Sequence, residues 1–296
     1  MRRPRHLLVG ALVLLAAWPS PRTERRGAPW SRVGSARADA ASSGLETDGT
    51  ATERLVRDEA PRLASAAHQL RFAKDRKLDL RGLAGSALAA ARRRAVRAYG
   101  AVIEYFPGDR AISAEAAFRA GELSRAGGAR AAATASFQDA WARGAGTPFR
   151  GRAAIALGRL VREDDPAAAL GHFEQALLDL DTPRGVRDEA MLWYARSQGD
   201  LGRGADARRL LERVARTALD PVDRVRAFDR IAESWIEAGD LEAAAGALHH
   251  CRRELSDLMR EQSKSGARLR DAVEGMRSFA RLRAAVKARW GTGSDG

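Results

Sequence analysis

The chain has 296 residues, a formal net charge of +13 and a composition that is 45% hydrophobic but only 6% aromatic. Alanine is abundant, whereas runs of Val, Ile, Thr and aromatic residues are scarce, which argues against a β-sheet and favours closely packed helices. The single cysteine, Cys251, excludes a disulfide within the chain, so stability has to come from packing.

The positive charge does not by itself indicate a nucleic-acid-binding protein. The first 38 residues contribute +7 of it and leave +6 for the remainder. Only four of the 51 basic residues are Lys and the chain has no Asn, which points to a compositional bias toward Arg. Acidic residues alternate with the arginines, as on a solvated helix face. We therefore do not expect nucleic acid as the partner.

The N-terminus has the pattern of a secretory signal peptide over residues 1–38. Arginines within the first five residues precede an apolar run from Leu7 to Trp18, which is shorter than the ~20 residues that span a bilayer. Ala36-Arg37-Ala38 has the form of a cleavage site, although an uncleaved anchor or a cytosolic leader would also fit. No Cys lies directly after the apolar run, where a lipidated protein would carry one, so we expect a non-lipidated, exported protein, periplasmic or secreted. Residues 39–52 are small and polar and predict a disordered linker.

Residues 53–81 are predicted to form an N-terminal helical segment. Its apolar residues recur at helical spacing, and Pro61 is expected to start or restart a helix, because proline is tolerated in a first turn. We expect this segment to pair as a hairpin with a helix from about Gly85 to Phe106.

About five repeat units are predicted over residues 82–255. In each unit a small residue is followed four positions later by a large one, and three positions after that by a medium one, which places all three on one stripe of a helix. The large residues are 38, 36, 38 and 37 positions apart. The five triplets are Ala95/Tyr99/Val102, Ala133/Phe137/Ala140, Ala169/Phe173/Ala176, Ala207/Leu211/Val214 and Ala244/Leu248/Cys251.

Turn signals precede most of these stripes, and another helical stripe precedes each turn. The signals are Gly127-Gly128, Asp164-Asp165-Pro166, Gly202-Arg203-Gly204 and Gly239-Asp240. Each unit therefore predicts a helix, a tight turn and a helix, and stacked units would bury one continuous core.

This pattern resembles the tetratricopeptide repeat family. The last unit matches best, with Ile231, Ala232, Trp235, Gly239, Ala244 and Leu248 at the family's signature spacing. The stretch from Tyr99 through Pro107 to Glu122 is similar to bacterial envelope members of the outer-membrane assembly lipoprotein and Tol–Pal coordinator type. The resemblance implies an all-α fold, an α-solenoid of antiparallel helix pairs that forms a right-handed superhelix with a C-terminal capping helix.

Residues 256–290 predict a basic amphipathic C-terminal helix, followed by a disordered tail over 291–296. Its apolar side includes Leu269, Met276 and Phe279, and basic residues gather toward its end. We favour a cap over the last repeat, because that unit needs a cover. Contact with a membrane surface or a partner is the alternative.

The sequence contains no constellation on which to base catalysis, a cofactor or a metal site. His249-His250-Cys251 does not predict a metal site, because adjacent helical side chains point about 100° apart and cannot converge on one ion. Glu163-Asp164-Asp165 precedes Pro166 and is explained by capping of the next helix. We find no phosphate loop, serine-hydrolase elbow, metalloprotease motif or calcium loop.

The resemblance implies a binding scaffold whose first helices line a concave face that takes a protein or peptide. The partner-binding residues that it suggests are Glu115, Phe118, Glu122, Arg125, Glu189, Arg196, Arg226, Asp229 and Glu233. The second unit contributes Ala154, Gly158 and Val161, a small apolar patch. The alternatives are a structural envelope spacer and a helical support for an uncharacterised enzyme. The residues specify neither the partner's identity nor the oligomeric state.

Overall fold

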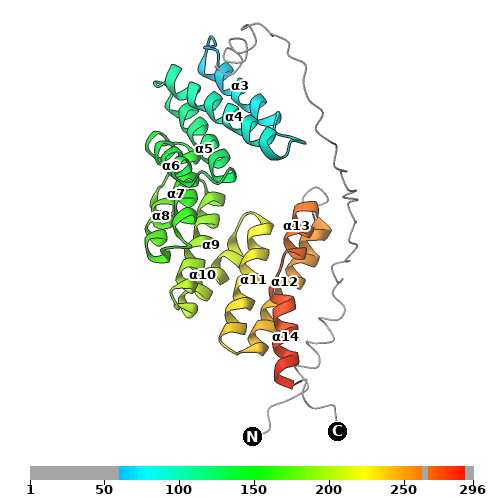
Figure 1. The fold of residues 1–296 in the computed structure, drawn as a ribbon. Coiled ribbons are helices and arrows are strands. Elements are labelled where there is room, and N and C mark those ends of the chain that lie inside the picture. The colour runs from blue at the N-terminus through cyan, green and yellow to red at the C-terminus, as the bar shows by residue number, and fades with distance from the viewer. Residues whose placement is uncertain (1–59, 262–265, 291–296) are drawn as a thin grey trace, which may run out of the picture.

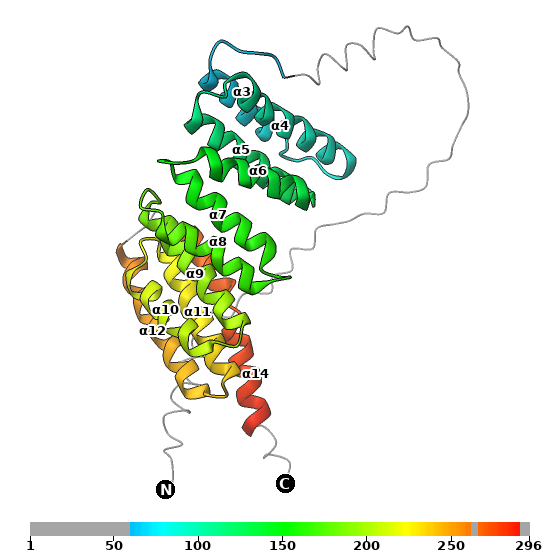
Figure 2. The same ribbon diagram turned by 90° about the vertical axis from the view of Figure 1, so that its left-hand side faces the viewer.

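The computed structural model describes residues 60–261 and 266–290, and every regular element in these ranges is a helix. The helices follow one another along a curved stack (Figures 1 and 2). We call the first helix of each pair an inner helix: α3 (Ala66–Leu78), α5 (Arg110–Ala126), α7 (Pro148–Val161), α9 (Arg184–Asp200) and α11 (Pro221–Glu237). The outer helices are α4 (Gly85–Tyr105), α6 (Arg130–Arg143), α8 (Pro166–Leu178), α10 (Gly204–Thr217) and α12 (Leu241–Glu261). The predicted all-α solenoid of helix pairs is confirmed.

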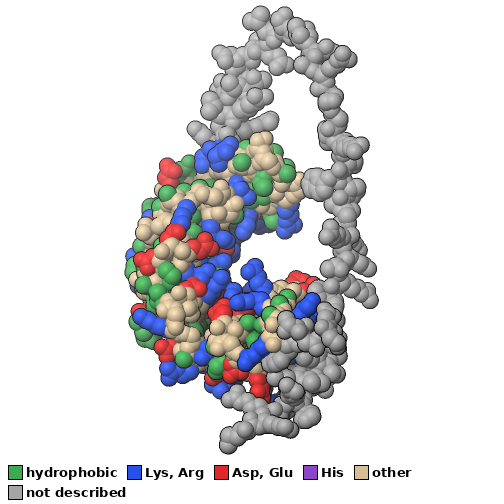
Figure 3. Space-filling view, turned by 60° about the horizontal axis from the view of Figure 1, so that its bottom comes forward, with side chains coloured by type: hydrophobic (Ala, Val, Ile, Leu, Met, Phe, Trp, Pro, Cys, Tyr) green, Lys and Arg blue, Asp and Glu red, His purple; other side chains and the backbone are tan. Residues whose placement is uncertain are grey.

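The curvature follows from the way in which successive pairs touch. Each helix packs against its neighbours in the sequence, and each inner helix also contacts the next inner helix. Contacts between successive outer helices are weaker. The stack therefore bends toward the inner helices, and these line the concave face, seen as the hollow in Figure 3.

The five predicted stripes form the core of the outer helices. All fifteen residues of the triplets are at most 3% exposed, and they pack against the inner helices. Cys251 belongs to the last stripe, and burial raises the pKa of its thiol to about 12. The prediction that Cys251 is a core residue is therefore confirmed.

Tight turns within the units end the inner helices at the predicted positions. Gly128, Gly202 and Gly239 each have a φ between 77° and 79°, in the left-handed region that favours glycine. The residue after each of these glycines donates its backbone N–H to the carbonyl five residues earlier, at 2.9–3.0 Å, as Asp240 does to Trp235. The second unit uses Asp165 instead, whose carboxylate accepts from the N–H of Ala168 at 2.9 Å and caps α8.

The N-terminal segment differs in one respect from the prediction. Pro61 does not start a helix, because α3 begins at Ala66, after Ser65, whose hydroxyl accepts from the N–H of His68. The expected hairpin is confirmed, since α3 packs against α4. The predicted signal peptide, the linker over 39–52 and residues 53–59 lie outside the described residues, as does the tail over 291–296.

The C-terminal segment covers the last pair, but it is not one helix. It is divided into the end of α12, α13 (Gly266–Glu274) and α14 (Ser278–Trp290). Both α13 and α14 pack on α11, and α14 also contacts α12. Leu269, Met276, Phe279 and Leu282 are buried in the same cluster as Leu248. The predicted cap is confirmed, and the break in the segment is what lets it fold back over α11.

Candidate functional site

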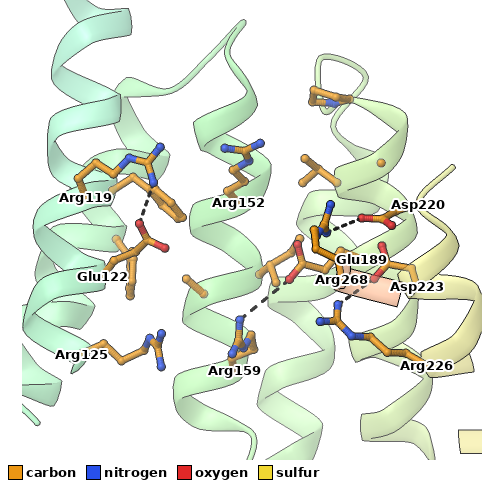
Figure 4. Close-up of a pocket in the computed structure, with 17 residues that line it drawn as sticks. Arg119, Glu122, Arg125, Arg152, Arg159, Glu189, Asp220, Asp223, Arg226 and Arg268 are labelled. Atoms are coloured by element: carbon orange, nitrogen blue, oxygen red, sulfur yellow. Dashed lines mark hydrogen bonds and ion pairs between the residues drawn. The ribbon is translucent and has the colours of Figure 1, made fainter. Parts of the chain in front are cut away.

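The concave face contains an open cavity of about 510 Å³ that spans successive inner helices. Side chains of α5, α7, α9 and α11 form its floor, and Arg268 of α13 closes one side (Figure 4). Its lining is strongly charged. The charged residues are Arg119, Arg125, Arg152, Arg159, Arg226 and Arg268 on the basic side, and Glu122, Glu189, Asp220 and Asp223 on the acidic side.

Charged residues run across the inner helices in rows with a strict period of 37 residues. The first row is Glu115, Arg152, Glu189 and Arg226, and the second is Glu122, Arg159, Arg196 and Glu233. A third row, Gly121, Gly158, Ala195 and Ala232, lies on the buried side of the same helices. The equal spacing means that each row occupies equivalent places on consecutive helices, so the second row puts arginine at its centre and acid at its ends.

The structure brings together five of the nine predicted partner-binding residues. Phe118, Glu122, Arg125, Glu189 and Arg226 all line the cavity. That they bind a partner stays a prediction.

The other four predicted residues lie outside the cavity lining. Glu115 is held by Lys74 at 3.0 Å and by Arg119 at 3.6 Å. Arg196 lies beside Trp193, farther along α9.

Asp229 and Glu233 are engaged by α14. The Asp229 carboxylate accepts from both the N–H and the hydroxyl of Ser278, at 3.1 and 2.6 Å. Glu233 is 6% exposed and pairs with Arg230 and with Arg281 of α14. These two acids hold the C-terminal cap, which differs from their expected place on an open surface.

The expected apolar patch in the second unit is wrong. Ala154 is completely buried, and a Cβ atom at Gly158 would lie 2.5 Å from the Phe173 ring. Both are therefore core positions where α7 and α8 approach closely. The groove positions of α7 are Arg152 and Arg159, which the sequence analysis missed. Gly121 and Gly158 are 37 residues apart. This spacing could have shown that they occupy equivalent core positions, and therefore which residues of α7 face the groove.

Several groove arginines lack an acidic partner within the described residues. Arg119, Arg226 and Arg268 pair with Glu122, Asp223 and Asp220 at 2.8–3.0 Å. Arg159 reaches Glu189 only at 4.0 Å. No carboxylate of the described chain lies within 4 Å of Arg125, Arg152 or Arg196. Figure 4 draws Arg125 and Arg152 without an interaction line.

Trp193 of α9 gathers three arginines around its indole ring. The guanidinium carbons of Arg159, Arg196 and Arg162 lie 4.6, 5.3 and 5.7 Å from the ring centroid. The ring also stacks on Phe173, with centroids 6.5 Å apart, which fixes the indole against the core. Cation–π contacts of this kind hold guanidinium groups in defined positions.

The electrostatics of this arginine cluster are unfavourable for its own charges. Burial, followed by the like charges of Arg230 and Arg162, lowers the pKa of Arg196 to about 10. Burial also lowers the pKa of Arg159, although Glu189 acts in the opposite direction. The folded chain therefore holds cations here at an electrostatic cost.

The described residues offer no group of three His, Cys, Asp or Glu side chains that could hold a metal ion. His249 and His250 are exposed on α12, whereas Cys251 faces the core. None of the helices in the described ranges is long and apolar enough to cross a bilayer.

The raised pKa of Asp223 leads us to predict that the stability of the fold depends on pH. Burial raises the pKa of its carboxyl from the usual 3.8 to about 6, against the opposing effect of Arg226. The folded state therefore binds a proton more readily than the unfolded state, and this contribution to stability is present below pH 3.8 and lost as the pH rises through 6. Replacing Asp223 by Asn should raise the free energy of unfolding at pH 7.5 by about 1–2 kcal/mol, after allowance for the helix N-terminus that favours the charge.

Urea denaturation between pH 4 and pH 7.5 measures this difference, which should shrink as the pH falls below about 6. Asp206→Asn is the matched control, because Asp206 has the same place in α10 and pairs with Arg209 three residues on, but its side chain is 53% exposed. An equal gain in both variants would contradict the assignment to burial.

No protein-family model matches the chain, and no curated protein matches its sequence. Among solved structures, PilW, a type IV pilus biogenesis factor, is 16% identical with a TM-score of 0.49, over 79% of this chain and 97% of PilW. YrrB, a tetratricopeptide repeat protein with an unusual peptide-binding site, is 17% identical with a TM-score of 0.44, over 72% and 95%. Repeats of a putative kinesin light chain from Podosopora anserina are 15% identical with a TM-score of 0.49, over 67% and 100%. The helix order and the 37-residue register of the chain itself establish the fold as a tetratricopeptide-like α-solenoid.

Proposed function

We propose that the chain is an interaction scaffold whose concave face binds a segment of a partner polypeptide. The observation that carries this proposal is the cavity of about 510 Å³, to which four consecutive inner helices contribute. An extended or helical segment would contact several units at once, which is how a repeat solenoid presents a long binding surface. The arginines without an acidic partner in the described chain offer it charged hydrogen bonds.

Site-specific photocrosslinking in the native host tests this proposal. A photoreactive amino acid replaces Ala156, a half-buried residue of the cavity lining, and the matched control places it at Arg213, which is exposed on outer helix α10. We expect a discrete protein adduct from position 156 that is absent from position 213. Adducts of equal yield at both positions, or none at 156, would contradict the proposal and favour a structural spacer.

We further propose that the chain functions outside the cytoplasm, in the cell envelope or as a secreted protein. The support is the signal-peptide pattern over residues 1–38 and the envelope-type resemblance of the first repeats. Mass spectrometry of the protein from its native host should find an N-terminus near Asp39. A soluble protein that retains Met1 would overturn this proposal.

A further inference from the structure

We infer that the bound segment is acidic, and that its carboxylates bind Arg125, Arg159 and Arg196 along the centre of the concave face. This inference rests on the proposed function, since it specifies the chemistry of the same surface. We call these three residues the central arginines; they come from α5, α7 and α9, three consecutive inner helices.

The first argument is the balance of charge at these residues. Within the described ranges no carboxylate lies within 4 Å of Arg125 or Arg196, and the nearest one to Arg159 is Glu189, at 4.0 Å. Elsewhere on this face, Arg162 and Arg230 each pair with an acid, Asp200 and Glu233. The central arginines, together with Arg152, are therefore the part of the face where cationic hydrogen-bond donors remain available to a ligand.

The second argument is the geometry around Trp193. Arg159 and Arg196 lie 4.6 and 5.3 Å from the indole centroid, so that the ring limits the positions of both groups. A guanidinium that lies on an aromatic ring keeps its edge N–H groups free, and these bind a carboxylate through two parallel hydrogen bonds. Because the guanidinium is already ordered, binding costs less side-chain entropy than at a free arginine.

The third argument is electrostatic. The lowered pKa of Arg196 reflects burial and crowding by Arg230 and Arg162. A carboxylate that binds there would offset the repulsion between these arginines. This favourable interaction would contribute to the binding affinity.

The acids of the rows favour an acidic polypeptide over a nucleic acid. Glu122 begins the row that holds Arg159 and Arg196, and Glu122, Glu189 and Asp223 all line the cavity. A nucleic-acid strand carries a phosphate at every nucleotide and would place some of these phosphates against the acids. A peptide can concentrate its carboxylates at the centre and leave neutral residues beside Glu122.

The test is fluorescence anisotropy with the purified full chain and labelled dodecapeptides. One peptide alternates Glu and Ala, the second alternates Gln and Ala, and an oligothymidylate of equal length is the nucleic-acid probe. The variant R125Q/R159Q/R196Q removes the central arginines. Its control, R209Q/R213Q/R216Q, removes the same charge from exposed positions of outer helix α10.

We expect the Glu peptide to bind the wild type, with an affinity at least about tenfold above that of the Gln peptide. The R125Q/R159Q/R196Q variant should lose about tenfold or more of that affinity, and the α10 control should change by no more than about twofold, because exposed charges act only over about a Debye length. Circular dichroism checks that the variants fold. If the triple variant does not, the single variant R125Q, at an exposed position, should still weaken binding severalfold.

Equal binding of the Glu and Gln peptides, an equal loss in the α10 control, or tighter binding of the oligothymidylate would each overturn the inference. The photocrosslinking at position 156 separates this failure from failure of the proposed function. A neutral or basic segment crosslinked at 156 would refute the acidic specificity and leave the groove as a binding site. Absence of an adduct would refute the groove itself.

Discussion

A Gly121→Ala chain is expected to lose about 1–3 kcal/mol of its free energy of unfolding, because the added methyl group overpacks the core. A Cβ atom at this position of α5 would lie 2.6 Å from the ring of Phe137 on α6. Phe137 is completely buried, and Phe118 lies against it with ring centroids 5.6 Å apart, so a shift of the Phe137 ring would disturb this aromatic contact. Urea denaturation followed by circular dichroism measures the loss.

The matched control is Gly171→Ala, which should have the opposite sign. Gly171 also lies inside a helix, α8, but a Cβ atom there would meet no atom within 4 Å. Alanine is favoured over glycine in a helix by about 1 kcal/mol, so this variant should gain stability. Destabilisation by both substitutions would show that the loss of stability does not come from the contact with Phe137.

A compensating substitution sharpens the same prediction. The pairs Ala195/Leu211 and Ala232/Leu248 occupy the places that Gly121 and Phe137 occupy in their own unit, with a smaller side chain opposite the alanine. Phe137→Leu in the Gly121→Ala background should therefore recover part of the loss. A double-mutant cycle measures the coupling energy between the two positions. If the two substitutions changed the free energy of unfolding additively, the predicted coupling would be disproved.

These pairs also explain why the fold could be predicted from the sequence. The close approach of an inner and an outer helix requires one small and one large residue at matching places, and this requirement recurs in the four units that follow the first pair. The triplets, such as Ala169/Phe173/Ala176, record it at helical spacing, so the outer helices and the turns before them could be located. The start of α3 could not, because Ser65 caps the helix through its hydroxyl, whereas Pro61 only permits one.

The groove residues could be predicted less well, because a small residue on an inner helix can lie either on the groove surface or at a close contact with the outer helix. Ala154 and Gly158 were interpreted as an apolar surface, yet their size serves the contact with α8. The side chains that face the groove, Arg152 and Arg159, differ in charge from the glutamates at the equivalent places in α5. Residues at equivalent places on the groove surface share their spacing along the sequence but not their residue type. They can therefore be located only from the spacing of the core row.

The acids of α11 show a second reason for the difference. Asp229 and Glu233 have groove spacing, but the C-terminal segment folds back and places Ser278 and Arg281 against them. That contact joins residues about 50 positions apart in the sequence, so the residue pattern within a repeat cannot predict it. The same contact explains part of the basic character of the C-terminal segment, because Arg281 pairs with both Glu233 and Glu237.

A chain that ends at Glu261 is expected to lose the order of its last helix pair while the first pairs persist. The truncation removes α13 and α14 and exposes the side of α11 and α12 that packs against Leu269, Phe279 and Leu282. Each fully buried side chain of this size contributes about 1.5–3 kcal/mol by leaving water, which is large compared with the stability of one repeat. The truncation would also leave the Asp229 carboxylate, whose pKa burial raises, without the two hydrogen bonds from Ser278.

Hydrogen exchange followed by mass spectrometry measures this effect unit by unit. In a solenoid each pair depends chiefly on its neighbours, so amides of α11 and α12 should lose protection by about tenfold or more, and those of α5 to α8 should change little. A chain that ends at Trp290 keeps both cap helices and is the control. Unchanged protection of α11 and α12 in the shorter chain would contradict the capping role, and the basic face of α14 would then be better explained by contact with a membrane or a partner.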